Sequence, residues 1–213
     1  MSAPALPTAM APRRSLDLAV VGAWAVLLGA VLAAPWLVPT EDTGDYLIRA
    51  TVRVALAYYA AAMVLMLTLR PREWAAATAR GRLARWCWAL AWATYAVHVG
   101  MAFHHYHHWS HADAVRHTRE VSGAGEGVYV SHLFGLLWGL DVAWWWLRPA
   151  AYAARPAWIG GVLHGFMAFI VFCGMVVYES GPIRWAGVVL FAGLALLLLA
   201  RRLRRGPFAR LPQ

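Results

Sequence analysis

Histidine is concentrated in one part of this chain. Seven of the nine histidines fall between His98 and His117, in the segment HVGMAFHHYHHWSHADAVRHT, and an eighth is His132. Imidazole is the side chain that most readily ligates a transition metal or haem iron near neutral pH. We therefore expect any cofactor or metal site to lie in or beside this segment.

Two of these histidines are spaced so that they can meet inside a membrane. Apolar runs at about 86–105 and 128–147 predict antiparallel neighbouring helices, and His98 and His132 lie about 9 Å and 6 Å inside their outer ends. Two imidazoles at one depth can clamp haem iron or complete a metal site. We predict His98 and His132 as axial ligands of haem b in an electron-transfer protein. The alternative is that each histidine hydrogen-bonds a neighbouring helix.

Arg49 and Arg53 lie one helical turn apart at the outer end of the preceding apolar run. Arg53 is predicted to pair with a haem propionate. The alternative is that these arginines pair with the acidic residues just before them in the chain, which are Glu41, Asp42 and Asp45.

The dense histidine cluster can be interpreted by helical spacing. If the helix at 86–105 continues outward, His104, His108 and His111 fall on one face at i, i+4 and i+7, and His107 pairs with His111 on an adjacent face. With His117 and nearby acidic residues, such a face suits Zn²⁺, Cu²⁺ or an iron ion. The alternative is a polar surface at the membrane interface. His104-x-x-His107-His108 also matches one box of the membrane di-iron hydroxylases.

A second polar pair is predicted nearer the other membrane surface. Asp141 and His164 both lie about 9–10 Å from the inner ends of their apolar runs. The spacings Gly135-x-x-x-Gly139 and Gly161-x-x-x-Gly165 allow these two helices to approach closely. We expect an Asp141–His164 hydrogen bond that acts as a structural clasp or as part of a proton or ligand path.

Composition places these residues in a membrane. The chain has 213 residues, 62% of them hydrophobic, with 13 Trp and several apolar runs near 20 residues, which predicts an all-α polytopic membrane helix bundle. The formal net charge is +9, yet the arginines cluster between the apolar runs, as residues that set membrane topology do. We therefore expect the lipid bilayer, and not nucleic acid, as the surroundings of this protein.

Six transmembrane helices are predicted between a disordered tail at 1–16 and a basic tail at 201–213. Their ranges are about 17–38, 47–69, 86–105, 128–147, 157–178 and 183–200. An alternative for the first run is a signal peptide cleaved after the small residues Ala33 and Ala34. Tryptophans at predicted boundaries fit an aromatic belt, namely Trp36, Trp86, Trp88, Trp109, Trp144, Trp145, Trp146, Trp158 and Trp185.

Arginine placement predicts the orientation. With both termini in the cytoplasm, most arginines lie inside, and the outer loops contain only Arg116, Arg119 and Arg184. The positive-inside rule then places the histidine cluster on the periplasmic or outer side of a bacterial inner membrane.

Two resemblances follow from these segments. RLARWCWALAWATYAVHVGMAFHHYHHWSHADAVRHT, followed by GEGVYVSHLFGLLWGLDVAWWW, resembles an uncharacterised family of bacterial multi-spanning membrane proteins of planctomycete type, over about residues 80–180. This resemblance implies a polytopic bacterial membrane protein and no activity.

The Arg-rich loop at 70–85, with His98 in the third run and His164 in the fifth, resembles the ferric reductase-like transmembrane domain. That family includes bacterial haem b subunits that pass electrons across the membrane. The resemblance implies haem b ligation involving His98 and His164. Because no flavin or nicotinamide domain is encoded, an electron partner would be supplied in trans. Two further classes stay open, a metal-handling membrane protein for Zn, Cu or Fe and a cofactor-free structural or assembly subunit.

Overall fold

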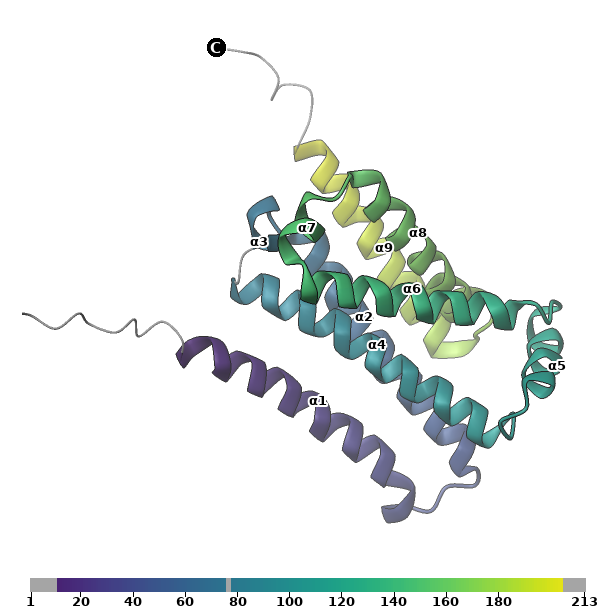
Figure 1. Ribbon diagram of the computed structural model, residues 1–213. Helices are drawn as coiled ribbons and strands as arrows, with labels where there is room; N and C mark the ends of the chain where they lie inside the picture. Colours follow the sequence, from purple (N-terminus) through teal and green to yellow (C-terminus); the bar gives the residue numbers. More distant parts are fainter. Residues whose placement is uncertain (1–10, 76–77, 205–213) are drawn as a thin grey trace, which may run out of the picture.

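The computed structural model describes residues 11–75 and 78–204, and this part of the chain contains helices and no strand. The long helices are α1 (Ala11–Leu37), α2 (Thr43–Thr68), α4 (Ala79–His105), α6 (Gly127–Leu147), α8 (Ala157–Phe172) and α9 (Gly181–Arg204) (Figure 1). The short ones are α3 (Pro71–Ala75), α5 (His111–Ser122) and α7 (Pro149–Ala154), and a π-helical turn, η2 (Cys173–Val177), continues α8. The prediction of an all-α chain is confirmed for these residues.

Four segments are long and apolar enough to cross a membrane: Ser15–Leu37, Thr43–Thr68, Ala157–Val177 and Gly181–Leu203. Helices α4 and α6, with 27 and 21 residues, are not among these four segments. α4 begins at Ala79 and not near residue 86, because Thr78 caps it by accepting a hydrogen bond from the Gly81 N–H. Similarly, α1 begins at Ala11 and not at 17. Of the predicted tails, 1–10 and 205–213 lie outside the described residues.

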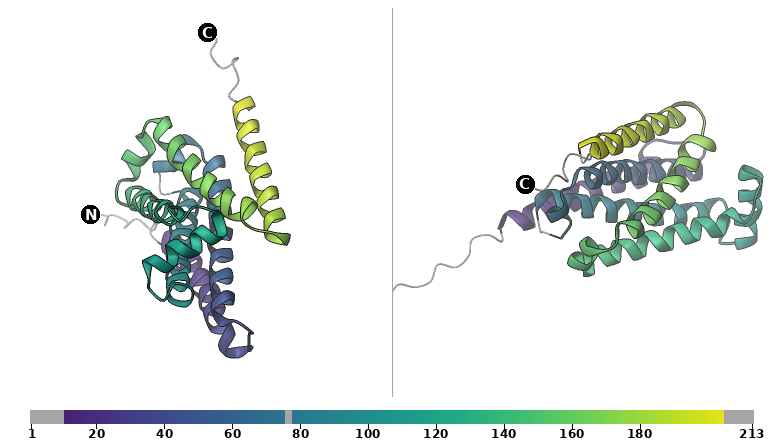
Figure 2. Two further views of the ribbon diagram at one scale, coloured as in Figure 1. Left: turned by 90° about the vertical axis from the view of Figure 1, so that its right-hand side faces the viewer. Right: turned by 90° about the horizontal axis from the view of Figure 1, so that it is seen from above.

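Five helices form a ring. α4 packs most extensively against α2 and also contacts α6, while α6 contacts α8. α9 packs on α2 and on η2 and so closes the ring, and α1 lies outside it against α4 and α2 (Figure 2). Asp17 of α1 pairs with Arg82, and the Trp24 indole donates to Thr94 Oγ1 over 2.8 Å.

The two ends of the ring differ in chemistry. α3, α7 and the last turns of α9 lie together at one end, which we call the arginine end (Figure 1). α5 and the turn that joins it to α4 lie at the opposite end, which we call the histidine end.

Tryptophan placement agrees with the predicted aromatic belt only in part. Trp36, Trp109, Trp158 and Trp185 are between 67% and 89% exposed, as belt residues are. Trp88 and Trp145 were predicted at a boundary, but they are 0% and 1% exposed and belong to the aromatic core. The prediction for these two was wrong because their indole N–H groups have internal acceptors, Asp141 Oδ2 and the Trp74 carbonyl.

The glycine pairs have a different role from the predicted one. A Cβ at Gly135 would lie 3.1 Å from the Tyr95 ring, and one at Gly139 would lie 2.9 Å from the Trp92 ring. These glycines therefore let α6 approach α4, and not α8 as predicted. On α8, a Cβ at Gly161 or Gly165 would meet nothing within 4 Å. Aromatic rings on α4 fill the space that the glycines leave.

Candidate functional site

A cavity of about 310 Å³ lies inside the ring at the histidine end, between α2, α4, α6 and η2. Its volume is at the lower end of the range of ligand sites, about 300–1,000 Å³. Of the predicted site residues, His98, His107, His132 and Arg53 line it. The fold thus brings part of the predicted haem site to one place.

His98 is held in one tautomer. Its Nδ1 lies 3.0 Å from the Ile48 carbonyl oxygen, which can only accept a hydrogen bond. Nδ1 therefore carries the proton, and Nε2 keeps its lone pair. Histidines that ligate metals are oriented in the same way, by a hydrogen bond from the other ring nitrogen to a carbonyl or carboxylate. His98 accordingly has the tautomer that a cofactor ligand requires.

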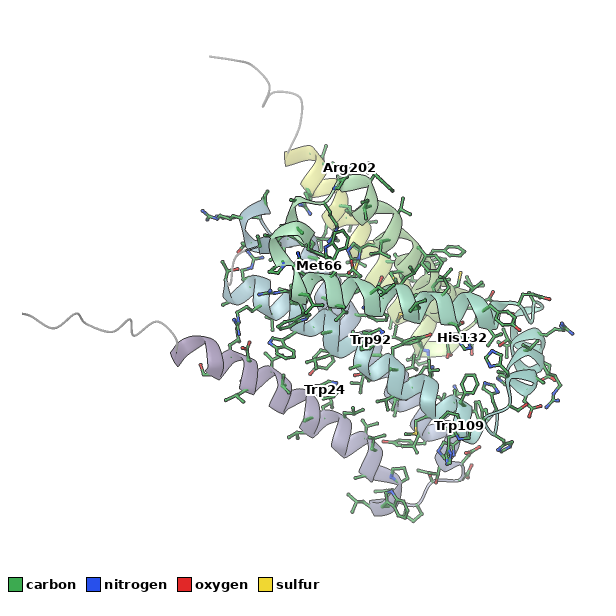
Figure 3. All side chains as sticks on the ribbon, viewed as in Figure 1. Trp24, Met66, Trp92, Trp109, His132 and Arg202 are labelled. Atoms are coloured by element: carbon green, nitrogen blue, oxygen red, sulfur yellow. The ribbon has the colours of Figure 1, made fainter. Side chains whose placement is uncertain are left out.

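His132 lies at the rim of the cavity. Its side chain is exposed, and Figure 3 places it at the α5 side of α6. Its ring centroid is 5.0 Å from that of His111 and 6.0 Å from that of Phe103. His132 and His98 therefore approach the cavity from two different helices.

His107 is buried between the cavity and α5. It is 8% exposed, its ring centroid is 5.4 Å from that of His117, and its Nδ1 has no hydrogen-bond partner among the described residues. Burial, followed by the positive charge of His117, lowers the pKa of His107. The neutral imidazole, which is the form that ligates metals, is thus favoured.

Sequence reasoning missed two residues in the cavity wall. Tyr59 is 1% exposed and Trp138 is 2% exposed, and neither the Tyr59 hydroxyl nor the Trp138 Nε1 has a partner among the described residues. Both lie far inside their helices, about 24 Å from the start of α2 and about 16 Å from the start of α6. In the sequence, both residues could have been noticed because Tyr and Trp usually lie near the membrane surfaces and not in the middle of a span.

The π-helical turn η2 was not predicted either. Gly174 and Met175, two of its five residues, line the cavity. π-Turns inside α-helices are rare and often lie at functional sites. Nothing in the local sequence distinguishes this turn from an ordinary helix.

Charged residues lie where α2 reaches the cavity. Arg49 pairs with Asp45 at 2.8 Å, and Asp45 also accepts a hydrogen bond from the Tyr106 hydroxyl. Arg49 therefore pairs with an acidic residue that precedes it in the chain, which was the alternative to binding a propionate. Arg53 lines the cavity together with Glu179.

The continuous histidine face predicted from helical spacing is absent from the described residues. α4 ends at His105, and His108 and Trp109 adopt positive φ values of 46° and 61°. Ser110 then caps α5 by accepting from the Asp113 N–H. Because the helix does not continue, His104, His108 and His111 do not share a face, and that prediction was wrong.

The clustered histidines form ring pairs instead. Ring centroids are 4.7 Å apart for His104 and His105, and the other pairs are His107 with His117 and His111 with His132. Within residues 11–75 and 78–204, no three His, Cys, Asp or Glu side chains are grouped as a metal site requires.

Asp141 and His164 lie close to each other at the arginine end but do not form the predicted hydrogen bond. Asp141 Oδ2 accepts from the Trp88 indole and the Tyr152 hydroxyl, each over 2.9 Å. His164 Nε2 lies 3.2 Å from Arg155 Nη2, and its ring is 5.3 Å from that of Trp88. Asp141 Oδ1 and His164 Nδ1 have no hydrogen-bond partner among the described residues, so they do not bond to each other. The direct Asp141–His164 bond was therefore a wrong prediction.

The ferric reductase-like resemblance implied one site for His98 and His164. The structure separates them, because His98 lines the cavity at the histidine end and His164 lines a second cavity at the arginine end. Comparison of the chain with protein-family models, with curated proteins and with solved structures gave no match.

Proposed function

We propose that this protein is a bacterial inner-membrane protein with six spans, that its histidine-lined cavity binds one haem b, and that it transfers electrons. The observation that carries this proposal is the tautomer of His98, whose Nδ1 is fixed by the Ile48 carbonyl. An imidazole held in this way presents its free Nε2 as a ligand.

The distribution of charge supports the six-span topology. Arg70 to Arg85, Arg148, Arg155 and Arg201 belong to the arginine end, and this end is cytoplasmic by the positive-inside rule. α4 and α6 complete the six spans because each is at least 30 Å long at about 1.5 Å per residue. Two of their polar side chains, His98 and Asp141, lie inside the bundle, His98 in the cavity wall and Asp141 only 2% exposed.

The donor set of the cavity fits haem b. His98 and His132 supply imidazole ligands from two helices, and Arg53 supplies a cation for a propionate. The unpartnered Tyr59 hydroxyl and Trp138 N–H offer hydrogen bonds deeper in the cavity. Phe103, Phe134 and other apolar side chains line much of the rest of the cavity.

Haem b bound here would supply reversible uptake of a single electron. The reduction potential of such a haem would depend on its imidazole ligands and on how deeply the site is buried. We propose that the electron donor or acceptor is a partner in trans.

The first test is the visible spectrum of the protein purified in mild detergent after expression with haem supplied, oxidised and dithionite-reduced. We expect a Soret band and sharp reduced α and β bands that are lost in His98→Ala and His132→Ala. His104→Ala is the matched control, because His104 lies on the same helix but is exposed and does not line the cavity.

A colourless protein, or bands that His98→Ala leaves unchanged, would contradict the haem proposal. Metal analysis on the same sample then separates the remaining classes. Stoichiometric metal that is lost with His107→Ala or His111→Ala indicates a metal-handling protein, and the absence of metal indicates a structural subunit.

A further inference from the structure

A second cavity, of about 590 Å³, lies at the arginine end. α8 and α9 meet at η2 and separate toward this end, as the view from above shows (Figure 2). The cavity lies between their separated ends and is bounded by the end of α2, by α3 and by α7. Met63, Met66 and Leu198 contribute an apolar wall, and Figure 3 shows Met66 and Arg202 at this end.

The charged groups of this cavity are all cations. Arg155, Arg201 and Arg202 line it, and its described lining contains no aspartate or glutamate. A guanidinium group stays protonated at any physiological pH. Arg201 also donates from Nη1 to the Leu67 carbonyl over 3.2 Å, which fixes it beside the cavity. The excess of positive charge along the described lining favours an anion in this partly apolar space.

Arg155 is held in place by uncharged groups. Its guanidinium carbon lies 3.4 Å from the centre of the Tyr152 ring, and its Nη2 lies 3.2 Å from His164 Nε2. A Cβ at Gly160 would come within 3.2 Å of Arg155 Nε, so the glycine leaves room for this side chain. Arg155 forms no ion pair within 4.0 Å among the described residues. Asp141 is the nearby carboxylate that interacts with Arg155 at longer range; its Oδ2 accepts from Trp88 and Tyr152, and its Oδ1 has no hydrogen-bond partner among these residues.

The hydrogen bond between His164 and Arg155 has one direction. An arginine has only donors, so His164 Nε2 must accept from Arg155. The ring proton of the neutral imidazole is then on Nδ1, which is buried and has no partner among the described residues. His164 thus orients Arg155, while the cavity itself offers guanidinium groups, which suit a ligand with anionic acceptor oxygens.

We propose that this cavity binds the phosphate group of an anionic phospholipid. Phosphate oxygens accept hydrogen bonds from guanidinium groups in pairs, and basic pockets between membrane helices on the cytoplasmic side suit anionic head groups. The acyl chains continue along the exposed apolar surfaces of α8 and α9, for example at Val162 and Leu199, which are 67% and 54% exposed. A free phosphate ion would make no apolar contact with the wall formed by Met63, Met66 and Leu198, whereas the acyl chains of a lipid would.

Native mass spectrometry of the full chain in a neutral detergent tests the proposal. The probes are phosphatidylglycerol and phosphatidylcholine with identical acyl chains. We expect one phosphatidylglycerol to bind about tenfold more tightly than phosphatidylcholine, and R201Q/R202Q to lose about that factor. R72Q/R148Q is the control, because it removes the same charge from two exposed residues at the same end that do not line the cavity.

A second variant tests the space and not the charge. Gly161 lines the cavity and has no atom within 4 Å of an added Cβ, so G161L fills the site while all three arginines remain. We expect G161L to reduce phosphatidylglycerol binding by about tenfold and G165L, which lies outside the cavity, to leave it unchanged.

Three results would overturn the proposal. One is equal binding of the two lipids by the unmodified chain, and another is a control variant that loses as much binding as its test variant. The third is inorganic phosphate that raises the melting temperature as much as phosphatidylglycerol does, which would assign the cavity to a free anion.

Discussion

His107 and His117 have neighbouring rings at the histidine end, but their surroundings differ. His107 is 8% exposed, whereas His117 is exposed to solvent. Burial disfavours a charged imidazole, and a protonated His117 nearby adds repulsion. Burial thereby favours the neutral form of His107, although the sequence gives all the clustered histidines the same chemistry.

This difference predicts a pH dependence of stability. The pKa of His107 in the fold lies below its ordinary value of 6.5, so the unfolded chain binds the proton more tightly and stability falls as the pH drops through that value. We expect the melting temperature in detergent to decrease between about pH 7.5 and pH 5.5, and His107→Phe to reduce that decrease.

His104→Phe is the control for this measurement, because His104 is exposed in the last turn of α4, three residues before His107. The same pH dependence in the unmodified chain and in His107→Phe would show that burial of His107 does not contribute to it.

At the scale of helices, the contact between α4 and α6 depends on small residues on one side and aromatic residues on the other. The Trp92 indole N–H donates to the Gly135 carbonyl over 3.0 Å, and the same ring lies over Gly139. Close approach of two helices at a glycine is typical of membrane bundles. Here the partner is a large ring and not a second glycine, so the two spacings GxxxG do not pair with each other.

Gly139→Ala should therefore destabilise the protein. An added Cβ would lie 2.9 to 3.0 Å from three atoms of the Trp92 ring, and overpacking of this kind costs about 1–3 kcal/mol. Gly165→Ala is the matched control, because its Cβ meets nothing within 4 Å. Unfolding in detergent measures both variants, and equal stability of the two would contradict this packing.

At the scale of the whole molecule, the ring places two unlike cavities at its two ends. The cavity at the histidine end offers imidazoles, and the cavity at the arginine end offers guanidinium groups. The cavity at the arginine end suits an anionic lipid because arginines and anionic lipids are both enriched on the cytoplasmic side of a membrane.

Cysteine labelling checks the proposed orientation. In a Cys173→Ala background, where the remaining Cys87 is buried, we expect Ala112→Cys in α5 to react with an impermeant maleimide in intact spheroplasts. Ala75→Cys in α3, also exposed, should react only after the membrane is opened. The reverse pattern would place the histidine end in the cytoplasm.

The sequence by itself predicted the helical class and the approximate positions of the long helices. Apolar runs near 20 residues have few alternatives to a helix in a membrane, because every backbone N–H and C=O must be satisfied within the segment. The placement of His98 and His132 at one level also came from the sequence, since helical rise fixes depth.

Only the tertiary structure decided which side chains meet. His98 is oriented by a carbonyl on α2, 50 residues away along the chain, and Asp141 is bound by Trp88 and Tyr152 and not by His164. The end of α4 at His105, the turn η2 and the contributions of Tyr59 and Trp138 to the cavity also belong to the fold. Periodicity gives the face and depth of a residue, whereas the rotation and tilt of each helix, which select its partners, are set by packing against its neighbours.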